Sequence, residues 1–522
     1  MRISTGQYFA NSSATYTKNF ADTAKTQNQI SSGQRIQTAA DDPVGAAKLL
    51  QLRQQSAVLD QYKGNITSAT NSLSSEESVL ANITTALQRA GELAIQGGNG
   101  AQTDDDRASI ASEIGQIKDT VFGLLNTKDS NGQYLFSGSK TSTQPYSLNS
   151  DGSYTYQGDE TQLSLQVSDN LSVATNDSGF SIFDLATNTS RTQTTQVSPA
   201  TVDGKLTVSA GQMTSMTSYN TQFAKGEPYS LTFTSGTQYT LTDASGNDVT
   251  AQSGGKGTYN SAKEGGDTIS LYGVNFMVNT NVAKTESADT VLAGRTFSLK
   301  TTPDTITANR LAGNTSTAQM TAGSVTNAAT YTAGFPTNGA LIKFTSASSY
   351  QVFAQPVTDS SKPITTGAYD GSGSLTTAGV TFNISGTPAT SDQFTVSANT
   401  HSTQNVLDTL NQLQVALNTP TANNPAAQLK LRNSLESAVG NLQSATNRVD
   451  VTRGSIGARE NALQIQSDQI TSLHTANATT QSQIGDTDLA EATTQLTLQQ
   501  TMLQAAQLSF AKISQLNLFD RL

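Results

Sequence analysis

The sequence predicts a multidomain α+β protein. Its N- and C-terminal ends are expected to form a long antiparallel, coiled-coil-like helical bundle, with all-β domains inserted between them. Apolar residues recur every seven positions near both ends of the chain, which is typical of paired helices. Short alternating apolar runs separated by turn residues occupy the middle, which indicates strands. The length of 522 residues suits several domains rather than one.

Near the N-terminus, one heptad stripe predicts a long helix over about 52–94. Its first positions are Leu52, Leu59, Ile66, Leu73, Leu80 and Leu87. Asp42 suits the N-cap of this helix, and Pro43 suits its first position, where a missing N–H costs nothing. Another helix is expected over 4–31, ended by a Ser-Ser-Gly break. A third is expected to begin near Thr103, where three aspartates favour the positive end of a helix dipole.

The C-terminal end repeats this design. One heptad stripe runs through Leu435, Leu442, Val449, Ile456, Leu463, Ile470 and Ile484. Asp488, with Glu491 three residues later, has the spacing of a helix cap. A further apolar stripe then follows to the end of the chain, through Leu489, Leu496, Leu503, Phe510, Ile513, Leu516 and Phe519. We expect the stripes at 52–94 and 435–484 to pair as core within one chain, because a long two-faced helix cannot bury its stripe alone.

The middle of the chain contains a duplication. Residues 230–235 resemble 341–346, and residues 273–276 resemble 379–382. The expected domains are 1–45 with 485–522 as a terminal helical assembly domain, 46–140 with 400–484 as the helical bundle, 141–224 as a β-rich insert, 225–301 and 337–398 as two related β units, and 302–336 as their connector.

Composition argues against several functional classes. The formal net charge is −10, and no basic stripe occurs, so nucleic acid is not an expected partner. The absence of cysteine excludes disulfides and thiolate metal sites. No window approaches 18 apolar residues, so no membrane insertion is expected. The N-terminus lacks the apolar core of a cleaved signal peptide, so export is expected by another route.

No residues predict an enzyme, a metal site or a cofactor. His401 and His474 are the only histidines, and neither has a metal-ligand spacing. With so few histidines and no cysteine, acid–base and nucleophilic catalysis lose their commonest groups. Asp41 and Asp42 precede a proline, which favours helix capping over a catalytic carboxylate pair.

The extreme ends, 1–40 and 486–522, are short and weakly charged. One pair of such helices leaves apolar surface exposed, so we expect them to become ordered when copies stack. A contact that repeats head to tail generates a ring or a helical tube. The residues therefore predict a polymer subunit.

Several motifs resemble the flagellin family. Residues 31–36 and 40–46 are similar to its N-terminal signature, and residues 453–463 and 484–491 are similar to its C-terminal stretch. Residues 132–138 and 154–159 resemble the members of that family that join hook to filament. The resemblance covers about 1–185 and 400–522 and does not inform 190–398.

This resemblance implies a structural subunit forming a ring at the hook–filament junction, outside the cell, needed for filament attachment and motility. It implies hook-associated protein 1, flagellin and further copies of the chain as partners. It also implies unfolded type III export, with a chaperone guarding the C-terminal helix, so the stripe at 489–519 is predicted as both chaperone and assembly interface. A filament flagellin and a secreted surface adhesin using the β insert remain alternatives.

Overall fold

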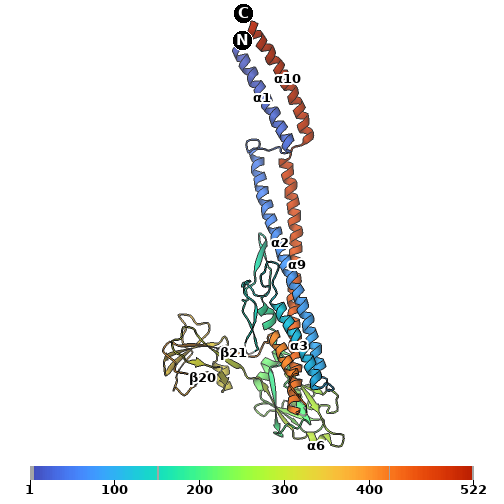
Figure 1. The fold of residues 1–522 in the computed structure, drawn as a ribbon, viewed down its shortest axis with the longest axis vertical. Coiled ribbons are helices and arrows are strands. Elements are labelled where there is room, and N and C mark those ends of the chain that lie inside the picture. The colour runs from blue at the N-terminus through green and yellow to red at the C-terminus, as the bar shows by residue number, and fades with distance from the viewer. Residues whose placement is uncertain (1–4, 150–151, 322, 423, 520–522) are drawn as a thin grey trace. The chain divides into compact units, whose positions relative to one another are not determined.

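The structure, a computed structural model, describes residues 5–149, 152–321, 323–422 and 424–519. The chain divides into two compact units, one formed by residues 1–74, 164–175 and 456–522, and the other by residues 75–163 and 176–455. Figure 1 follows the elements along the chain, with helices at both ends and strands between them. The expected α+β class, with helical ends and inserted β domains, is confirmed.

Six longer helices within the described residues come from the two ends of the chain. They are α1 (Thr5–Ser32), α2 (Pro43–Gly97), α3 (Asp104–Leu125), α8 (Val406–Leu417), α9 (Pro425–Gly485) and α10 (Leu489–Phe519). Shorter helical segments lie between them: η1 (Phe180–Asp184), α4 (Met216–Ser218), η2 (Tyr219–Phe223), α5 (Ala224–Gly226), η3 (Thr250–Gln252), α6 (Ala288–Leu292) and α7 (Ala328–Gly334).

Helices α2 and α9 pair in antiparallel fashion. In the first unit, the Asn477 Nδ2 donates to the Leu52 carbonyl at 2.8 Å, and the Ser74 hydroxyl donates to Glu460 at 2.9 Å. Residue numbers therefore increase along α2 in the direction in which they decrease along α9. Apart from Ile484, which is half-buried, the expected heptad residues of both helices are buried: Leu52, Leu59, Ile66, Leu73, Leu80 and Leu87 on α2, and Leu435, Leu442, Val449, Ile456, Leu463 and Ile470 on α9.

Helix α8 was not singled out by the heptad stripes. The Asn405 side chain caps it by accepting from the Leu407 N–H at 2.7 Å, and its buried leucines pack on α3. Helix α3 begins with a capping box, because the hydroxyl of Thr103 and the carboxylate of Asp106 satisfy each other's backbone N–H groups. At 12 residues, α8 is too short to carry a repeating heptad, which is why periodicity did not reveal it.

Two small hairpins follow α3. The first pairs β1 (Tyr146–Leu148) with β2 (Tyr154–Tyr156), and the second pairs β3 (Ser164–Ser168) with β4 (Leu171–Ala174). The second hairpin lies on the helices of the first unit, where Tyr62 donates to Asp169 at 2.9 Å and Arg459 donates to the Ala174 carbonyl at 3.2 Å. Residues 141–224 therefore do not form one insert.

The first β domain is built from two antiparallel sheets. One has the order β5-β12-β8-β9, and the other has the order β10-β11-β6 with β7 also paired to β11. The strands are β5 (Thr192–Ser198), β6 (Leu206–Val208), β7 (Gln212–Met213), β8 (Tyr229–Phe233), β9 (Tyr239–Thr242), β10 (Asp267–Leu271), β11 (Val274–Thr280) and β12 (Thr296–Thr301). Their inward side chains form a core rich in Tyr, Phe, Leu and Val.

The second β domain repeats these pairings within one sheet of order β14-β20-β15-β13-β21-β16-β17-β18, with β19 paired to β20. Its strands are β13 (Thr305–Arg310), β14 (Gln319–Met320), β15 (Gly323–Val325), β16 (Ala340–Ser346), β17 (Ser349–Ala354), β18 (Thr365–Ala368), β19 (Ser374–Thr377), β20 (Val380–Ser385) and β21 (Gln393–Asn399). It encloses a separate core.

The duplicated unit is larger than the sequence motifs indicated. Strand β13 flanks β21 as β5 flanks β12, and β14 and β15 join β20 as β6 and β7 join β11. Residues 302–336 are therefore not a connector but the first part of the second repeat. Likewise, the first repeat begins near 192 rather than 225. Strands β5 and β13 are mostly polar, and β6, β7, β14 and β15 have only two or three residues each, so these early strands show little apolar alternation.

Candidate functional site

The candidate site is the pair of terminal helices, α1 and α10, with the two linkers that join them to α2 and α9. The linkers lie side by side and are hydrogen-bonded to each other. Thr487 N–H donates to the Gly33 carbonyl at 2.9 Å, and Arg35 N–H donates to the Gly485 carbonyl at 2.7 Å. The Arg35 guanidinium also donates to the Ile484 carbonyl at 2.6 Å. We call this arrangement, residues 33–42 with 484–488, the linker clasp.

Glycine and aspartate explain why the chain turns at the clasp. Gly33 has a φ of +70°, a left-handed conformation that glycine adopts without steric cost. Asp42 accepts from the Gly45 N–H at 2.9 Å at the start of α2, and Pro43 is the first residue of that helix. At the start of α10, Asp488 accepts from two backbone N–H groups at 2.9 and 3.2 Å. In both helices, backbone N–H groups of the first turn, which have no partner within the helix, are thus satisfied by a capping carboxylate.

Asp41 holds the N-terminal linker. Its carboxylate accepts from the N–H groups of Gln37 and Thr38 at 3.1 and 2.8 Å, and Lys25 of α1 pairs with it at 2.8 Å. The Lys25 ammonium, followed by the Thr38 backbone N–H, lowers the pKa of this carboxyl well below its usual range. The linker is therefore tied to α1 by a charge that is present at neutral pH.

Helices α1 and α10 run side by side along a seam with four- and three-residue steps (Figure 1). On α10 the inward positions are Ala492, Leu496, Gln499, Leu503, Ala506 and Phe510. On α1 they are Ser12, Tyr16, Asn19, Thr23, Thr26 and Ile30. The α1 side is mostly polar, and the Gln499 Oε1 is buried without a hydrogen-bond partner among the described residues. The seam therefore buries little apolar surface for its length.

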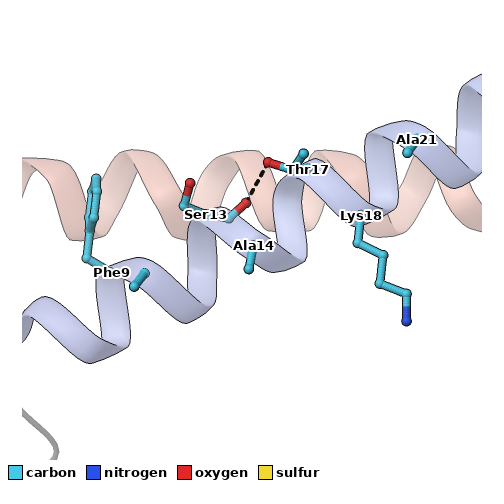
Figure 2. A pocket seen from close by; sticks show the side chains of 7 residues that line it. Phe9, Ser13, Ala14, Thr17, Lys18 and Ala21 are labelled. Carbon is cyan, nitrogen blue, oxygen red and sulfur yellow. Dashed lines mark hydrogen bonds between the residues drawn. The ribbon is translucent and has the colours of Figure 1, made fainter.

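Aromatic rings mark the outer part of the seam. The Phe510 ring lies 5.2 Å from that of Phe9 and 6.4 Å from that of Tyr16, measured between centroids. Phe9 is still 37% exposed. A shallow surface continues from Phe9 along α1 to Ala21, and Figure 2 shows the small side chains and Lys18 that line it. This surface is open to contact by another chain.

A second apolar face of α10 points away from the seam. Leu498, Met502 and Leu508 are 55%, 51% and 67% exposed. At 100° per residue, Leu498 and Leu508 lie about 140° around the helix from Leu503, and Met502 lies about 100° from it. Large exposed apolar side chains grouped on one face are typical of interaction surfaces.

The predicted stripe on α10 is divided by the structure. Leu496, Leu503 and Phe510 are half-buried at the seam, whereas Leu489 is 56% exposed. The side chains of Ile513, Leu516 and Phe519 lie outside the described residues. Sequence reasoning missed Leu498, Met502 and Leu508 because it followed one apolar stripe and left out the rest of the helix surface. A search for apolar residues around the whole helix would have found them.

The two short motifs near the first hairpin come together. The Tyr156 hydroxyl donates to the Phe136 carbonyl at 2.8 Å, and the Asp159 N–H donates to the Ser137 carbonyl at 3.1 Å. Asp159 in turn accepts from the Ser139 N–H at 2.7 Å. Residues 132–138 and 154–159 thus form one folded element rather than two independent sites.

No arrangement for metal chemistry was found in the described part of the chain. Within it, no three His, Cys, Asp or Glu side chains are grouped closely enough to hold a metal ion. The His474 Nε2 lies 3.5 Å from the exposed carboxylate of Asp60, and His401 lies in the segment that returns from the β domains to α8. Among the described helices, none is both long enough and apolar enough to cross a membrane.

Comparison with known families agrees with this helical architecture. Residues 3–141 match the bacterial flagellin N-terminal helical region, and residues 439–522 match the bacterial flagellin C-terminal helical region. The two ends of the chain are thus similar to the terminal helical regions of bacterial flagellins.

The chain is also similar to individual proteins of known name. Over 187 residues, 36% of this chain, it is 37% identical to proteins named flagellar hook-associated protein 3 from Salmonella typhimurium and Escherichia coli. The chain spans 58% of the length of each of these relatives. The crystal structure of a flagellar hook-associated protein 3 from Legionella pneumophila aligns with 83% of this chain and 98% of its own, at 21% identity and a TM-score of 0.46.

Proposed function

We propose that the protein is a structural subunit of the bacterial flagellum, located outside the cell at the junction between hook and filament. The observation that carries this proposal is the 37% identity to two proteins named hook-associated protein 3. The terminal helices support it, because they expose apolar side chains on a thin two-helix pair. We propose no catalytic role and no cofactor.

The terminal domain, 1–45 with 485–522, is proposed as the assembly domain. Its α10 helix has two apolar sides with different roles. Leu496, Leu503 and Phe510 hold α10 against α1 within one subunit, whereas Leu498, Met502 and Leu508 contact the next subunit. We propose Leu489, Ile513, Leu516 and Phe519 as further residues of the assembly interface. Repetition of the same contact from copy to copy builds a ring.

The proposed partners follow from that position. Hook-associated protein 1 lies on the hook side, flagellin lies on the filament side, and copies of this chain lie beside it. Before assembly, an export chaperone covers α10, because both apolar sides are accessible when α1 is not yet folded against it. Export through the type III apparatus then delivers the unfolded chain.

A strain that lacks the gene tests the proposal. We expect hooks without filaments and flagellin monomers in the medium, seen by electron microscopy and by blotting. A complementing copy with an epitope tag in the loop after α7, near residues 335–338, is expected to give one band at the outer end of the hook. Label along the whole filament would instead identify a filament flagellin.

A surface adhesin is the second candidate, because the β domains at 192–399 have cores of their own and lie outside the terminal regions that match flagellins. Deletion of residues 192–399 discriminates the two. Retained motility with lost attachment to surfaces would assign binding to the β domains, and retained attachment with lost filaments would assign them to the junction.

A further inference from the structure

A polar pocket in the second unit lies where the chain passes between its helices and the β domains. Its volume is about 310 Å³. Helices α8 and α9 form one side. The other side comes from three separate passages of the chain, at residues 188–190, 302 and 401–404. Segments that are far apart in sequence thus meet around one cavity.

Three asparagines make the pocket rich in hydrogen-bond donors. Asn188, Asn433 and Asn441 line it, and each Oδ1 already accepts from a backbone N–H, at 2.9, 3.1 and 2.8 Å respectively. A backbone N–H can only donate, so these bonds fix which way each carboxamide points. The groups that these side chains still offer are their three NH₂ groups.

The described residues that line the pocket carry positive but no negative charge. Lys430 lies at its rim, and no Asp or Glu is among the described residues that line it. This is unusual for a chain with 40 acidic residues and a formal net charge of −10. Lys430 makes no ion pair with the described residues, so its ammonium is available to a ligand.

His401 provides an independent indication. Its backbone has a φ of +53°, a conformation that is uncommon outside glycine and that occurs often at functional sites. Its Nε2 is buried and has no hydrogen-bond partner among the described residues. The residue lines the pocket, so its imidazole signals can report on a ligand bound there.

We propose that this pocket binds a small organic oxyanion, a carboxylate or a phosphate monoester. The ammonium of Lys430 and the NH₂ groups of Asn433 and Asn441 donate to its oxygens, and His401 forms part of the pocket wall. Such charge-assisted bonds are roughly twice as strong as neutral ones. The volume lies at the small end of ligand pockets, which span about 300–1,000 Å³, and it leaves room for more than a bare ion.

The two histidines of the chain provide a direct assay. We would label the full-length protein with ¹⁵N-histidine and follow both imidazoles by NMR while adding millimolar sodium phosphate, sodium glucuronate or glucose at constant ionic strength. His401 signals are expected to shift and saturate with phosphate, glucuronate or both. His474, which lies in the other unit, serves as the internal control.

Two substitutions test the donors. Asn433→Asp keeps the acceptor for the Ala210 N–H but replaces the NH₂ group with a charged oxygen, and it is expected to abolish saturable binding. Lys430→Gln is expected to weaken binding about tenfold or more. Asn447→Asp on the exposed side of α9 and Lys225→Gln on exposed α5 make the same charge changes elsewhere. Both are expected to bind like the parent.

The outcomes separate the possible ligands. Saturation by only one anion supports the proposal and assigns the pocket to phosphate or to carboxylate. The proposal is overturned if neither anion moves the His401 signals, or if glucose saturates them equally well. Unchanged binding in both Asn433→Asp and Lys430→Gln overturns it as well. Circular dichroism of each variant checks that the helices remain folded.

Discussion

The outer apolar face of α10 allows the sharpest prediction. We replace Leu498, Met502 and Leu508 with glutamine, which is a good helix former but does not favour burial. The seam residues Leu503 and Phe510 stay unchanged. The triple variant therefore removes apolar surface from one side of the helix while its pairing with α1 is preserved.

The size of the effect follows from exposure. Complete burial of a Leu or Met side chain contributes about 1.5–3 kcal/mol. The three side chains are between 51% and 67% exposed in the isolated chain, so a neighbouring subunit can still bury about half of each. Their loss is expected to cost roughly 3 kcal/mol per contact, which is a roughly 100-fold weaker association.

The assay is incorporation into flagella in a strain that lacks the natural gene. We expect the triple variant to be exported into the medium but to be absent from isolated hook–filament junctions. Thr493→Gln with Thr497→Gln is the matched control, because both threonines are exposed on the same helix and carry little apolar surface. This control is expected to support motility.

A second comparison separates the two sides of α10. Leu496→Gln with Leu503→Gln weakens the seam, so amide exchange in α1 and α10 of the purified protein is expected to accelerate. The triple variant should leave that exchange unchanged. Normal incorporation of the triple variant into junctions would refute the assignment of its face to the next subunit.

Three further predictions concern single residues. Asn477→Asp puts a carboxylate where a buried amide donates to a backbone carbonyl of α2. It is expected to lower the free energy of unfolding, measured with denaturant, by about 2–4 kcal/mol. The control Asn477→Leu is expected to lower it by about 1 kcal/mol or less. Lys25 lowers the pKa of Asp41, so this carboxylate stabilises the linker above the unfolded carboxyl pKa of about 4, and the stabilisation is lost as pH falls through the folded pKa. Amide protection in the linker should therefore vanish in acid. The Asp41→Asn variant should lack that protection at every pH. Burial raises the pKa of Asp184, and its hydrogen bonds, including one from Tyr146, oppose that rise. Stability should therefore fall as pH rises from about 4 through the raised pKa, and Asp184→Asn should flatten that dependence in thermal unfolding.

Local sequence signals identified most of the helical ends. A heptad sustained over many residues allows one arrangement, a long helix with a buried seam, so the spacing alone assigns Leu73 and Leu463 to the core, and both are buried. Helix ends were predicted equally well, because a Gly after Ser-Ser is typical of a helix break and an Asp before Pro is typical of an N-cap. Helix α8 was not predicted because it is only about three turns long, too short for a repeated heptad.

The β domains were only partly readable. The hairpins of β8 with β9 and of β16 with β17 have strong alternation, and their sequences resemble each other. Strands β14 and β15 have only two and three residues, and β13 is mostly polar, so they show little alternation. The partner strand β21 lies about 90 residues after β13 along the chain. Only the assembled sheet reveals that 302–336 is the first part of a repeat.

The sequence by itself determined most of the long helices, their ends and the absence of cysteine chemistry, because those features depend on composition or on residues close together in the chain. Tertiary structure decided which side of α10 faces α1, how the linkers clasp each other, and that Asn188, Asn433 and His401 share one pocket. These outcomes depend on distant segments meeting, and a local pattern carries no information about which distant segment will be its neighbour.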